Sequence, residues 1–444
     1  MTQLLRERER ASGADIGHAL KREIPGFSVR QLGYPSLTRL LLEAADDVVA
    51  VEKKGIDLVW ALGESISDRD LEYALGVETE PRQVAVADSF VTWAQFINFR
   101  SCRNVKLDLA ESGLTVLVGP NGSGKSTLLH GISYASQVTR GKPRALFSGP
   151  RDVRRLRSSN ATTPMELAIG AANGITLRLS ADPIEDSETQ FTVALAWGNK
   201  IQQWTSPGKP PSPPLPNRPE CRPFWPSILL RFRAEALATP AEVVEGQPRL
   251  SFDGTGLPML LMYLANNEPQ RLREVVDGVR QIVPAVEETR QVLRDSDHRD
   301  AVKMPRVHLE VKMRGAGWVP ADLLSEGTLF AFGIQAIMHQ PNPPRILLMD
   351  DIDRGLHPKA QRELIKQLKH IPENGGPRLI ISTHSPYILD EIPAESVRVI
   401  RSDGSGTRLR ALTDHPEWQE WKSSMTSGEF WGYVGEDWLE NSNE

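Results

Sequence analysis

The chain has 444 residues, of which 40% are hydrophobic and 25% are charged, and its net charge is -5. This length predicts two or three domains, and the composition argues against a disordered or fibrous protein. The mild acidity excludes a surface that is basic throughout, so any nucleic-acid contact is expected in a local patch. Cys102 and Cys221 match no metal-ligand spacing, which is typical of a reducing compartment. No stretch approaches the roughly 20 apolar residues of a membrane helix, so we expect a cytoplasmic protein with no membrane partner.

Residues 1–64 carry the pattern of two helices followed by a two-stranded wing. DIGHALKREI and SLTRLLLEA have helical spacing, and VVAVEKKGIDLVWAL predicts two strands that turn at Lys54 and Gly55. This order is typical of a small α+β winged-helix domain. Residues 12–55 also resemble the OST-HTH (LOTUS) family in their Ile-Gly pair and their Leu-Gly-Tyr run. The resemblance implies binding of RNA or protein, and a docking domain with no nucleic-acid role stays open.

The polar, acidic residues 65–87 predict a linker to a second domain at residues 88–400. A middle insertion at about 140–320 contains PGKPPSPPLPNRPECRPFWP, which cannot be a regular helix or an internal strand, so an exposed loop is expected. LPMLLMYLANNEPQRLREVVDGVRQIVPAVEETRQVL and LFAFGIQAIMHQ have helical spacing, whereas RILLMD and RLIIST predict strands. Residues 401–444 form a tryptophan-rich tail, in which SGEFWGYVGEDWLE is either a docking segment or a helix packed back on the domain.

A glycine-rich loop lies between the strand TVLV and the helical segment TLLHGISYA, and it matches the pattern G-x4-G-K-[ST]. Such a loop surrounds a phosphate chain with backbone N–H groups at the positive end of a helix. Lys125 is expected to reach the β and γ phosphates of ATP, and the hydroxyl of Ser126 to bind Mg²⁺. A glycine-rich turn with a surface lysine would not explain the flanking strand and helix. The predicted phosphate site consists of Gly119, Pro120, Asn121, Gly122, Ser123, Gly124, Lys125, Ser126 and Thr127.

Two predicted strands end in polar residues that suit phosphate chemistry. RILLMD ends at Asp350 and is followed by Asp351, and RLIIST is followed by His384. The ends of parallel strands meet at one edge of the sheet, where nucleotides bind in α/β folds. Asp350 is expected to hold Mg²⁺ through water, and Asp351 to orient the attacking water. Taken alone, two aspartates after a strand are a common turn or helix cap, and a single histidine there is usually structural.

These motifs, in this order, resemble the ABC-type ATPases of the RecF, SMC and OLD-like branch over residues 88–400. The resemblance implies an α/β P-loop NTPase domain, with a mixed sheet flanked by helices and a helical insertion. It implies that His384 is the catalytic switch histidine that senses the γ phosphate. The branch has glutamate where this chain has Asp351 and Asp353. A side chain one methylene shorter lies roughly 1 to 1.5 Å further from the same water, so slow hydrolysis of ATP is expected.

LLSEGTLFAFGIQAI resembles the ABC signature, with Ser325 and Gly327 at the start of its helix. Serine at a helix start is also a common N-cap. In the family this helix end faces the γ phosphate of ATP held by a second protomer, which implies a homodimer with ATP sandwiched between two copies. NFRS matches the family's early strand, where Arg100 or its neighbours approach the nucleotide. The Mg²⁺-binding glutamine of the family has no clear counterpart, and Gln137 lies close to the phosphate loop.

The motifs together predict a sensor or clamp that dimerises around ATP and controls a separate effector, such as a nuclease or toxin. Anti-phage defence and genome maintenance are the expected settings, and nucleic acid stays open as a partner. The leading winged helix and the Gly-Leu-His-Pro run disfavour a transporter motor. An OLD-type nuclease would need a further TOPRIM domain, and the sixty residues after His384 are too few for one. A non-catalytic protein that binds ATP as a structural ligand, and RNA or protein through its N-terminal domain, is the alternative.

Overall fold

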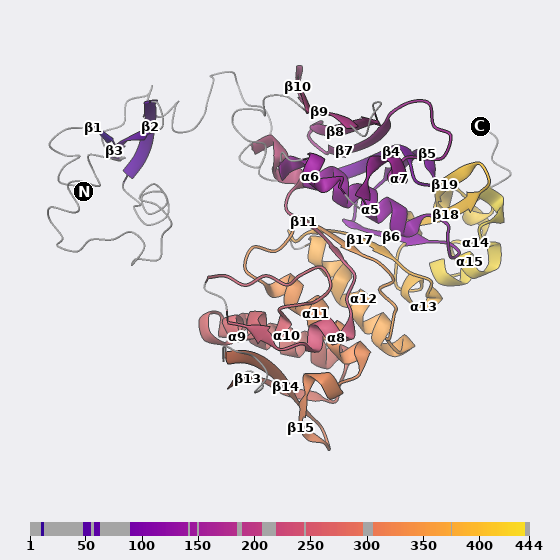
Figure 1. The fold of residues 1–444 in the computed structure, drawn as a ribbon. Coiled ribbons are helices and arrows are strands. Elements are labelled where there is room, and N and C mark those ends of the chain that lie inside the picture. Colours follow the sequence, from indigo (N-terminus) through magenta and orange to yellow (C-terminus); the bar gives the residue numbers. More distant parts are fainter. Residues whose placement is uncertain are drawn as a thin grey trace. The chain divides into compact units, whose positions relative to one another are not determined.

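The chain divides into two units, residues 1–84 and 85–444, in the computed structural model (Figure 1). No helix among the described residues has the length and apolar character needed to span a bilayer. The structure describes residues 10–12, 48–54, 57–62, 89–140, 143–148, 151–183, 189–206, 219–243, 246–295, 305–373 and 375–439.

The described part of the first unit is a three-stranded antiparallel sheet in the order β1-β3-β2. Its strands are β1 (Arg10–Ser12), β2 (Val48–Lys54) and β3 (Asp57–Leu62). The register pairs Lys54 with Asp57, so β2 and β3 form the hairpin that the sequence predicts as the wing. The pairing of β1 with β3 is an addition that the sequence pattern did not predict. The two predicted helices and the predicted linker at 65–87 lie outside the described residues.

The second unit has an α/β fold around a six-stranded sheet in the order β11-β16-β17-β6-β18-β19, in which only β19 is antiparallel to its neighbour. β6, β16 and β17 are buried along their whole length, which explains their unbroken apolar sequences. The carboxyl ends of the parallel strands therefore meet at one edge. The strands are β6 (Leu114–Val118), β11 (Ser227–Leu230), β16 (Ile346–Met349), β17 (Arg378–Ser382), β18 (Val397–Asp403) and β19 (Gly406–Ala411).

A second six-stranded sheet is antiparallel and has the order β10-β9-β8-β7-β4-β5. β7 and β11 lie within residues 140–320 and pair with β4 and β16, which lie outside that range, so this stretch is part of both sheets. The strands are β4 (Val91–Phe99), β5 (Cys102–Asp108), β7 (Met165–Ala171), β8 (Thr176–Pro183), β9 (Thr189–Trp197) and β10 (Lys200–Ser206). Short helical segments beside it are η3 (Val138–Arg140), α6 (Pro143–Leu146) and α7 (Val153–Leu156).

Helix α5 (Lys125–Gln137) lies between these two sheets (Figure 1). Its buried residues Leu128 and Ile132 share one core with Phe96 of the antiparallel sheet and Leu348 of the parallel sheet. The helix begins at the phosphate loop, so the packing of α5 fixes the position of that loop. Burial of its apolar face therefore ties the candidate site to both sheets.

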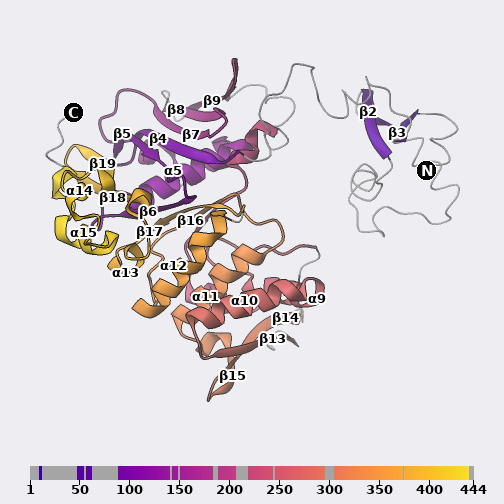
Figure 2. The ribbon, with the colours of Figure 1, turned by 180° about the vertical axis from the view of Figure 1, so that it is seen from behind.

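The opposite face of the parallel sheet is covered by helices, as Figure 2 shows from behind. These are α8 (Ala234–Ala238), α9 (Leu257–Asn267), α10 (Pro269–Ile282), α11 (Glu326–His339) and α12 (Pro358–Glu373). Beyond them lies a small antiparallel sheet of β12 (Ala241–Glu242), β13 (Val286–Asp295), β14 (Pro305–Met313) and β15 (Gly317–Pro320), with η7 (Ala321–Leu323) after it.

The helical prediction for the segment after α10 is wrong from Val286 onward. Pro284 follows the last helical residue, Ile282, and proline cannot continue a helix. Val286–Asp295 is instead strand β13, which pairs with β14 along its length. Its β-branched residues favour the extended backbone, and pairing with β14 stabilises the strand although the apolar spacing also fits a helix.

The proline-rich stretch is only partly described, since residues 207–218 lie outside the described part. Its end forms the 3₁₀ helix η6 (Pro219–Phe224), in which Cys221 and Phe224 are buried. The expectation of an exposed loop is therefore wrong for this end. Proline tolerates the short 3₁₀ geometry, and the buried Phe224 attaches the segment to the core below α5.

The C-terminal segment packs back on the domain, which decides between the two alternatives for SGEFWGYVGEDWLE. Phe430 is fully buried, and its ring lies 5.2 Å from that of Trp418, centroid to centroid. The hydroxyl of Ser427 donates to the carbonyl oxygen of Ile392 at 2.7 Å. The elements after β17 are α13 (Pro386–Leu389), η8 (Ala394–Ser396), η9 (Leu412–Asp414), α14 (Trp418–Trp421), α15 (Ser427–Val434) and η10 (Asp437–Leu439).

Two helical glycines allow a matched test of the packing around α5. A Cβ at Gly131 would lie 2.3 Å from a ring carbon of Phe96, whereas a Cβ at Gly432 in α15 would meet nothing within 4 Å. We expect Gly131→Ala to lower the free energy of unfolding by about 1–3 kcal/mol through overpacking. Gly432→Ala should raise it by about 0.5–1 kcal/mol, because alanine is the better helix former. Urea unfolding measures both, and equal effects of the two changes would contradict this packing.

Candidate functional site

The predicted phosphate loop connects β6 to α5 and is shaped by three glycines. Gly119, Gly122 and Gly124 have φ values of 146°, 78° and 109°. A Cβ at Gly119 would lie 2.0 Å from the carbonyl oxygen of Ile400, so only glycine fits there. The first N–H groups of α5 have no helical acceptors, as at every helix start. The hydroxyl of Ser123 is buried and has no hydrogen-bond partner among the described residues. Buried donors without protein acceptors fit an anionic ligand.

Lys125 is held inside this loop. Its Nζ donates to the carbonyl oxygens of Gly119 at 2.8 Å and Pro120 at 3.0 Å, and its side chain is buried. Burial lowers the pKa of Lys125, and the nearby carboxylates of Asp351 and Asp350 oppose that shift. The ammonium group therefore lies in the loop, close to Asp351, the predicted catalytic carboxylate, and to Asp350, the predicted Mg²⁺ ligand.

Asp350 is the point at which four elements meet. One carboxylate oxygen, Oδ1, accepts hydrogen bonds from the hydroxyls of Ser126 at 3.1 Å and Ser382 at 2.7 Å. The other, Oδ2, forms an ion pair with Nη2 of Arg231 at 3.2 Å. The carboxylate is only 5% exposed. The start of α5 and the ends of β11, β16 and β17 are thereby joined through one side chain.

These groups suit Mg²⁺ only if the ligand supplies further oxygens. No cluster of three or more His, Cys, Asp or Glu side chains that could hold a metal occurs in the described part of the chain. Ser126 and Asp350 nevertheless present a hydroxyl and a carboxylate to the same point. Mg²⁺ in phosphate sites is held by one or two protein oxygens together with waters and phosphate oxygens. The residues present therefore fit an ion that arrives with a nucleotide.

Asp351 has the left-handed backbone conformation, with φ at 52°. Aspartate tolerates this region better than most residues, and the backbone N–H of Asp351 donates to the hydroxyl of Ser382 at 2.8 Å. Partial burial and then the charge of Asp350 raise the pKa of Asp351, while His384 and Lys125 oppose the rise. The carboxylate of Asp351 is therefore a better proton acceptor than that of an ordinary aspartate.

His384 is positioned by Asp353. Oδ1 of Asp353 accepts from the hydroxyl of Thr383 at 2.6 Å and from the backbone N–H of His384 at 3.3 Å. His384 is half-buried, and its proximity lowers the pKa of Asp351. The aspartate that replaces the family's second glutamate thus anchors the backbone on which His384 sits.

Ser325 caps α11, and its hydroxyl accepts from the backbone N–H of Thr328 at 3.3 Å. The side chain is exposed. Gly327 is buried against the loop that follows Asp351, since a Cβ there would lie 2.6 Å from the carbonyl oxygen of Gly355. The start of α11 and the loop after the acidic pair are therefore in direct contact.

Arg100 and Gln137 lie in different surroundings. The residue after Arg100 is linked to the phosphate loop through Thr407, whereas Gln137 is the last residue of α5. Arg100 lies over the ring of Phe99, with 5.5 Å from its guanidinium carbon to the ring centroid, and its neighbour Ser101 accepts a hydrogen bond from Thr407. Thr407 in turn approaches Gly124 of the loop so closely that a Cβ there would lie 2.7 Å from its hydroxyl. Gln137, at the end of α5, donates to the hydroxyl of Ser133 at 2.9 Å.

Sequence reasoning missed Arg231, Ser382 and Thr407. Arg231 directly follows the apolar strand β11, just as Asp350 directly follows β16, and this pattern was the available signal. The contact itself joins residues 119 positions apart, so the pairing of β11 with β16 was needed to reveal it.

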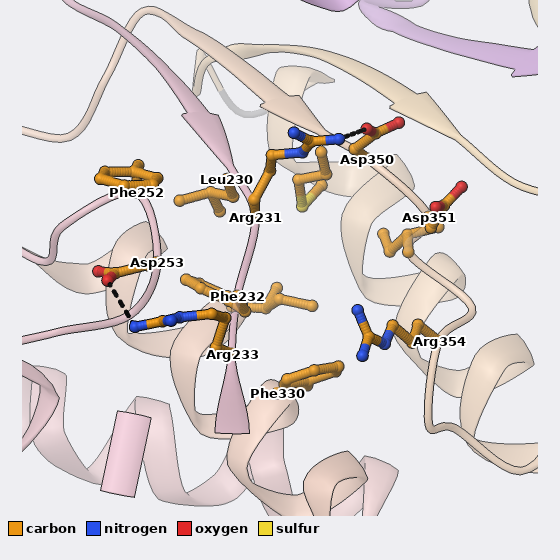
Figure 3. A pocket seen from close by; sticks show the side chains of 13 residues that line it. Leu230, Arg231, Phe232, Arg233, Phe252, Asp253, Phe330, Asp350, Asp351 and Arg354 are labelled. Atoms are coloured by element: carbon orange, nitrogen blue, oxygen red, sulfur yellow. Dashed lines mark hydrogen bonds and ion pairs between the residues drawn. The ribbon is translucent and has the colours of Figure 1, made fainter. Parts of the chain in front are cut away.

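A cavity of about 530 Å³ opens beside Asp350 and Asp351 (Figure 3). Figure 3 shows Arg231 turned toward Asp350, and Arg233 turned toward Asp253, with which it pairs at 3.6 Å. The side chains of Phe232 and Phe330 form the wall toward the helices. The lining residues are Leu230, Arg231, Phe232, Arg233, Phe252, Asp253, Phe330, Ile334, Met349, Asp350, Asp351, Ile352 and Arg354.

Three family models match parts of the chain. Residues 259–390 match the model described as "AAA domain, putative AbiEii toxin, Type IV TA system", and residues 95–159 match one described as "AAA domain". Both descriptions name an AAA domain, so the chain is similar to AAA-family ATPases over these two ranges. Residues 1–58 match the model described as "OST-HTH/LOTUS domain".

Two curated proteins are similar to parts of this chain. The "Retron Vc95 probable ATPase" of Vibrio cholerae serotype O1 biovar El Tor is 36% identical over 73 residues, 16% of this chain and 13% of that protein. The OLD nuclease of Thermus scotoductus is 24% identical over 344 residues, 70% of this chain and 61% of that protein. The chain therefore spans less than two thirds of the length of either relative.

Among solved structures, an SMC head bound to the C-winged helix domain of ScpA is similar to this chain. It is 13% identical with a TM-score of 0.49, and the match covers 74% of this chain and 99% of that one.

The raised pKa of Asp351 predicts a stabilising substitution. The pKa of Asp351 in the folded state lies above 3.8, the ordinary value for an aspartate, so the folded state binds the proton more tightly and the ionised carboxylate destabilises the fold. Asp351→Asn is therefore expected to raise the melting temperature of the nucleotide-free chain at neutral pH. The gain should shrink as pH falls through the folded pKa and vanish below 3.8, where both states are protonated. Thermal unfolding followed by circular dichroism tests this, with the exposed Asp182→Asn as control, and a lower melting temperature for Asp351→Asn at neutral pH would contradict it.

Proposed function

We propose that this ATPase domain hydrolyses ATP slowly and uses the cycle to close and open a dimer that controls a separate effector. The observation that carries the proposal is the meeting of Ser126 and Ser382 on one oxygen of Asp350, with Asp351 as the next residue. This arrangement joins a phosphate loop to two carboxylates at one edge of the sheet. Such a junction suits a metal-bound triphosphate and an attacking water.

ATP would bind with its phosphates against the loop and the first turn of α5. Lys125 would exchange the carbonyl oxygens of Gly119 and Pro120 for phosphate oxygens, and charge-assisted hydrogen bonds of that kind are the stronger ones. Ser126 and Asp350 would hold Mg²⁺, which neutralises charge on the phosphates when it is bound. The buried hydroxyl of Ser123 would gain an acceptor that the described residues do not provide.

Asp351 would orient the attacking water and accept a hydrogen bond from it, which its raised pKa favours. His384, held by Asp353 through its backbone, would sense the γ phosphate. The shorter reach of aspartate supports slow turnover. The alternative, a static switch that binds ATP without hydrolysis, rests on the same short side chain.

The dimer part of the proposal rests on Ser325. This N-cap and its neighbour Glu326 are exposed, and Leu323 just before them is 72% exposed. A helix start with exposed N–H groups attracts anions, so a second copy can offer it to the γ phosphate. Contact between Gly327 and Gly355 would pass any movement of the second copy to the loop after Asp351.

The setting of this activity is inferred from the relatives. One is named a retron ATPase, another an OLD nuclease, and one matching family model is described as a toxin domain. These names support a role in anti-phage defence or genome maintenance. We propose that the effector is a separate protein such as a nuclease or toxin, that the chain works in the cytoplasm, and that ATP and Mg²⁺ are its ligands.

The turnover of ATP separates the hydrolysing switch from the static one. We expect Lys125→Ala to abolish ATP binding, and Asp351→Asn to bind ATP but lose about 100-fold or more in turnover. Asp351→Glu should turn over faster than the native chain, because the carboxylate reaches the water. Phosphate release and the binding of a fluorescent ATP analogue measure these effects, with Asp182→Asn as the control. Tight ATP binding by the native chain with no phosphate release would favour the static switch.

The mass of the protein in solution tests whether ATP holds two copies of the chain together. With ATP and Mg²⁺, Asp351→Asn is expected to elute as a dimer of the 49.3 kDa chain, because the trapped triphosphate holds two copies together. Adding Ser325→Arg should keep the protein monomeric while ATP still binds. Light scattering after size exclusion measures both, and Ser112→Arg, a substitution outside the α11 start, serves as the matched control. A dimer that is indifferent to Ser325→Arg would overturn this interface.

A further inference from the structure

A second groove, of about 460 Å³, lies beside the phosphate-loop helix. One face of α5 lines it with residues such as His130 and Tyr134, and the start of β11 lines it from another side. Six of its lining residues define what we call the arginine groove: Arg151, Arg231, Arg249, His130, Trp225 and Phe252. Arg231 and Phe252 also line the cavity beside Asp350, so the two hollows share these two side chains.

The charge of the groove is one-sided. Three arginines line it, and none of the described residues that line it is acidic. Arg231 is paired with Asp350, which lies outside the groove's lining. Arg151 and Arg249 are exposed, and neither forms an ion pair or side-chain hydrogen bond with another residue in the described ranges. On a chain of net charge -5, this is a local basic patch, and such a patch selects anions.

His130 adds hydrogen-bonding groups to the groove without adding charge. Burial, and then the charges of Arg100 and Arg231, lower the pKa of His130 to about 4, so the ring is neutral at physiological pH. Its neutral nitrogens can therefore donate and accept hydrogen bonds inside the groove.

Aromatic rings in the lining give the groove a surface on which a base can stack. Phe252 is 60% exposed although it is a large apolar side chain, and Trp225 is half-buried beside it in the lining. Exposed rings next to cationic side chains are the usual platform for a base with its phosphate. The volume lies within the range of small-ligand pockets, which suits one nucleotide unit rather than a duplex.

We propose that the arginine groove binds a phosphorylated nucleotide unit of a single-stranded nucleic acid. Arg151 and Arg249 hold the phosphate, and the base stacks on Phe252. The same chemistry could also recognise a free mononucleotide, and the experiment below separates the two sources. The site is separate from the phosphate loop, because Gly119 to Thr127 contribute none of its lining residues.

Arg231 connects this groove to the ATP site, a step that rests on the proposed function. A phosphate in the groove attracts the guanidinium of Arg231 away from Oδ2 of Asp350. Asp350 then loses a cation that competes with Mg²⁺, while its Oδ1 still faces Ser126. Occupation of the groove therefore favours Mg²⁺ and ATP, and by reciprocity Mg²⁺ favours occupation of the groove.

Binding of a fluorescently labelled single-stranded oligonucleotide to the full chain tests the groove. We expect Arg151→Glu and Arg249→Glu each to weaken binding of the oligonucleotide by about tenfold or more. When the logarithm of the binding constant is plotted against the logarithm of the salt concentration, Arg249→Ala should make the slope shallower by about one. Arg273→Glu makes the same charge change on α10, outside the groove, and should weaken binding far less. The comparison is made in Lys125→Ala, which removes phosphate binding at the loop, and repeated in the native chain in case that variant does not fold. Equal losses for groove and control variants would overturn the proposal.

Photo-crosslinking locates the contact independently of affinity. An oligonucleotide that carries 5-iodouridine is expected to crosslink at Trp225 or Phe252, and crosslinks confined to residues 1–84 would overturn the groove as the site.

Competition with AMP distinguishes whether the groove binds a nucleic-acid strand or a free mononucleotide. No displacement by AMP supports the strand, and full displacement by AMP identifies a free mononucleotide and overturns the strand as occupant.

The coupling is tested by the Mg²⁺ concentration that half-saturates binding of a fluorescent ATP analogue. The oligonucleotide is expected to lower this concentration several-fold in the native chain, and Arg231→Gln is expected to lower it without the oligonucleotide. Arg231→Lys should restore the native dependence. No shift in either case would overturn the role of Arg231. Absence of ATP binding altogether would remove the proposed ATPase function, while strand binding to the groove would stand.

Discussion

The buried carboxylate of Asp350 is the constraint on which the rest of the site depends. Removing a carboxylate from water costs several kcal/mol unless it is paired and hydrogen-bonded, and this one is satisfied by two hydroxyls and one guanidinium. Hydrogen bonds to a charged group contribute about 1.5–3 kcal/mol each. The partners come from α5, β17 and β11, so the strand order of the parallel sheet must bring three distant segments to one point. The same pairing makes the site ready for a metal, because Ser126 and Asp350 already face each other.

Ser382 extends this junction to the second carboxylate. Its hydroxyl donates to Asp350 and accepts the backbone N–H of Asp351, so one side chain sets the positions of both acids. Asp353 does the same for the end of β17 by holding Thr383 and His384. The loops after β16 and β17 are thereby joined, and the start of α11 contacts the same loop at Gly355. Movement of the loop after β16, the loop after β17 or the start of α11 is expected to displace Asp351. This suits a switch that assembles only when two copies meet.

Parts of this arrangement could be predicted from the sequence and others could not. The phosphate loop and the strands that lead to it and to Asp350 are local patterns, in which short apolar runs end in glycines or charges. The helical prediction for Val286–Asp295 was wrong because its apolar spacing fits a helix as well as a strand, and its pairing with β14 determines that it is a strand. Arg231 was missed for a similar reason: it meets Asp350 through strand pairing across 119 positions. The roles of Ser325 and His384 depend on a ligand and a second copy, so they stay predictions.

A structure of the full chain with Mg²⁺ and a non-hydrolysable ATP analogue tests the central claim most directly. We expect the β and γ phosphates against Lys125, the metal between Ser126 and Asp350, and Ser325 of a second copy at the γ phosphate. Asp350 should then have exchanged at least one of its present partners for the metal. A triphosphate bound away from the loop at 119–127, or a metal that leaves Asp350 with the same two hydroxyls and Arg231, would contradict it.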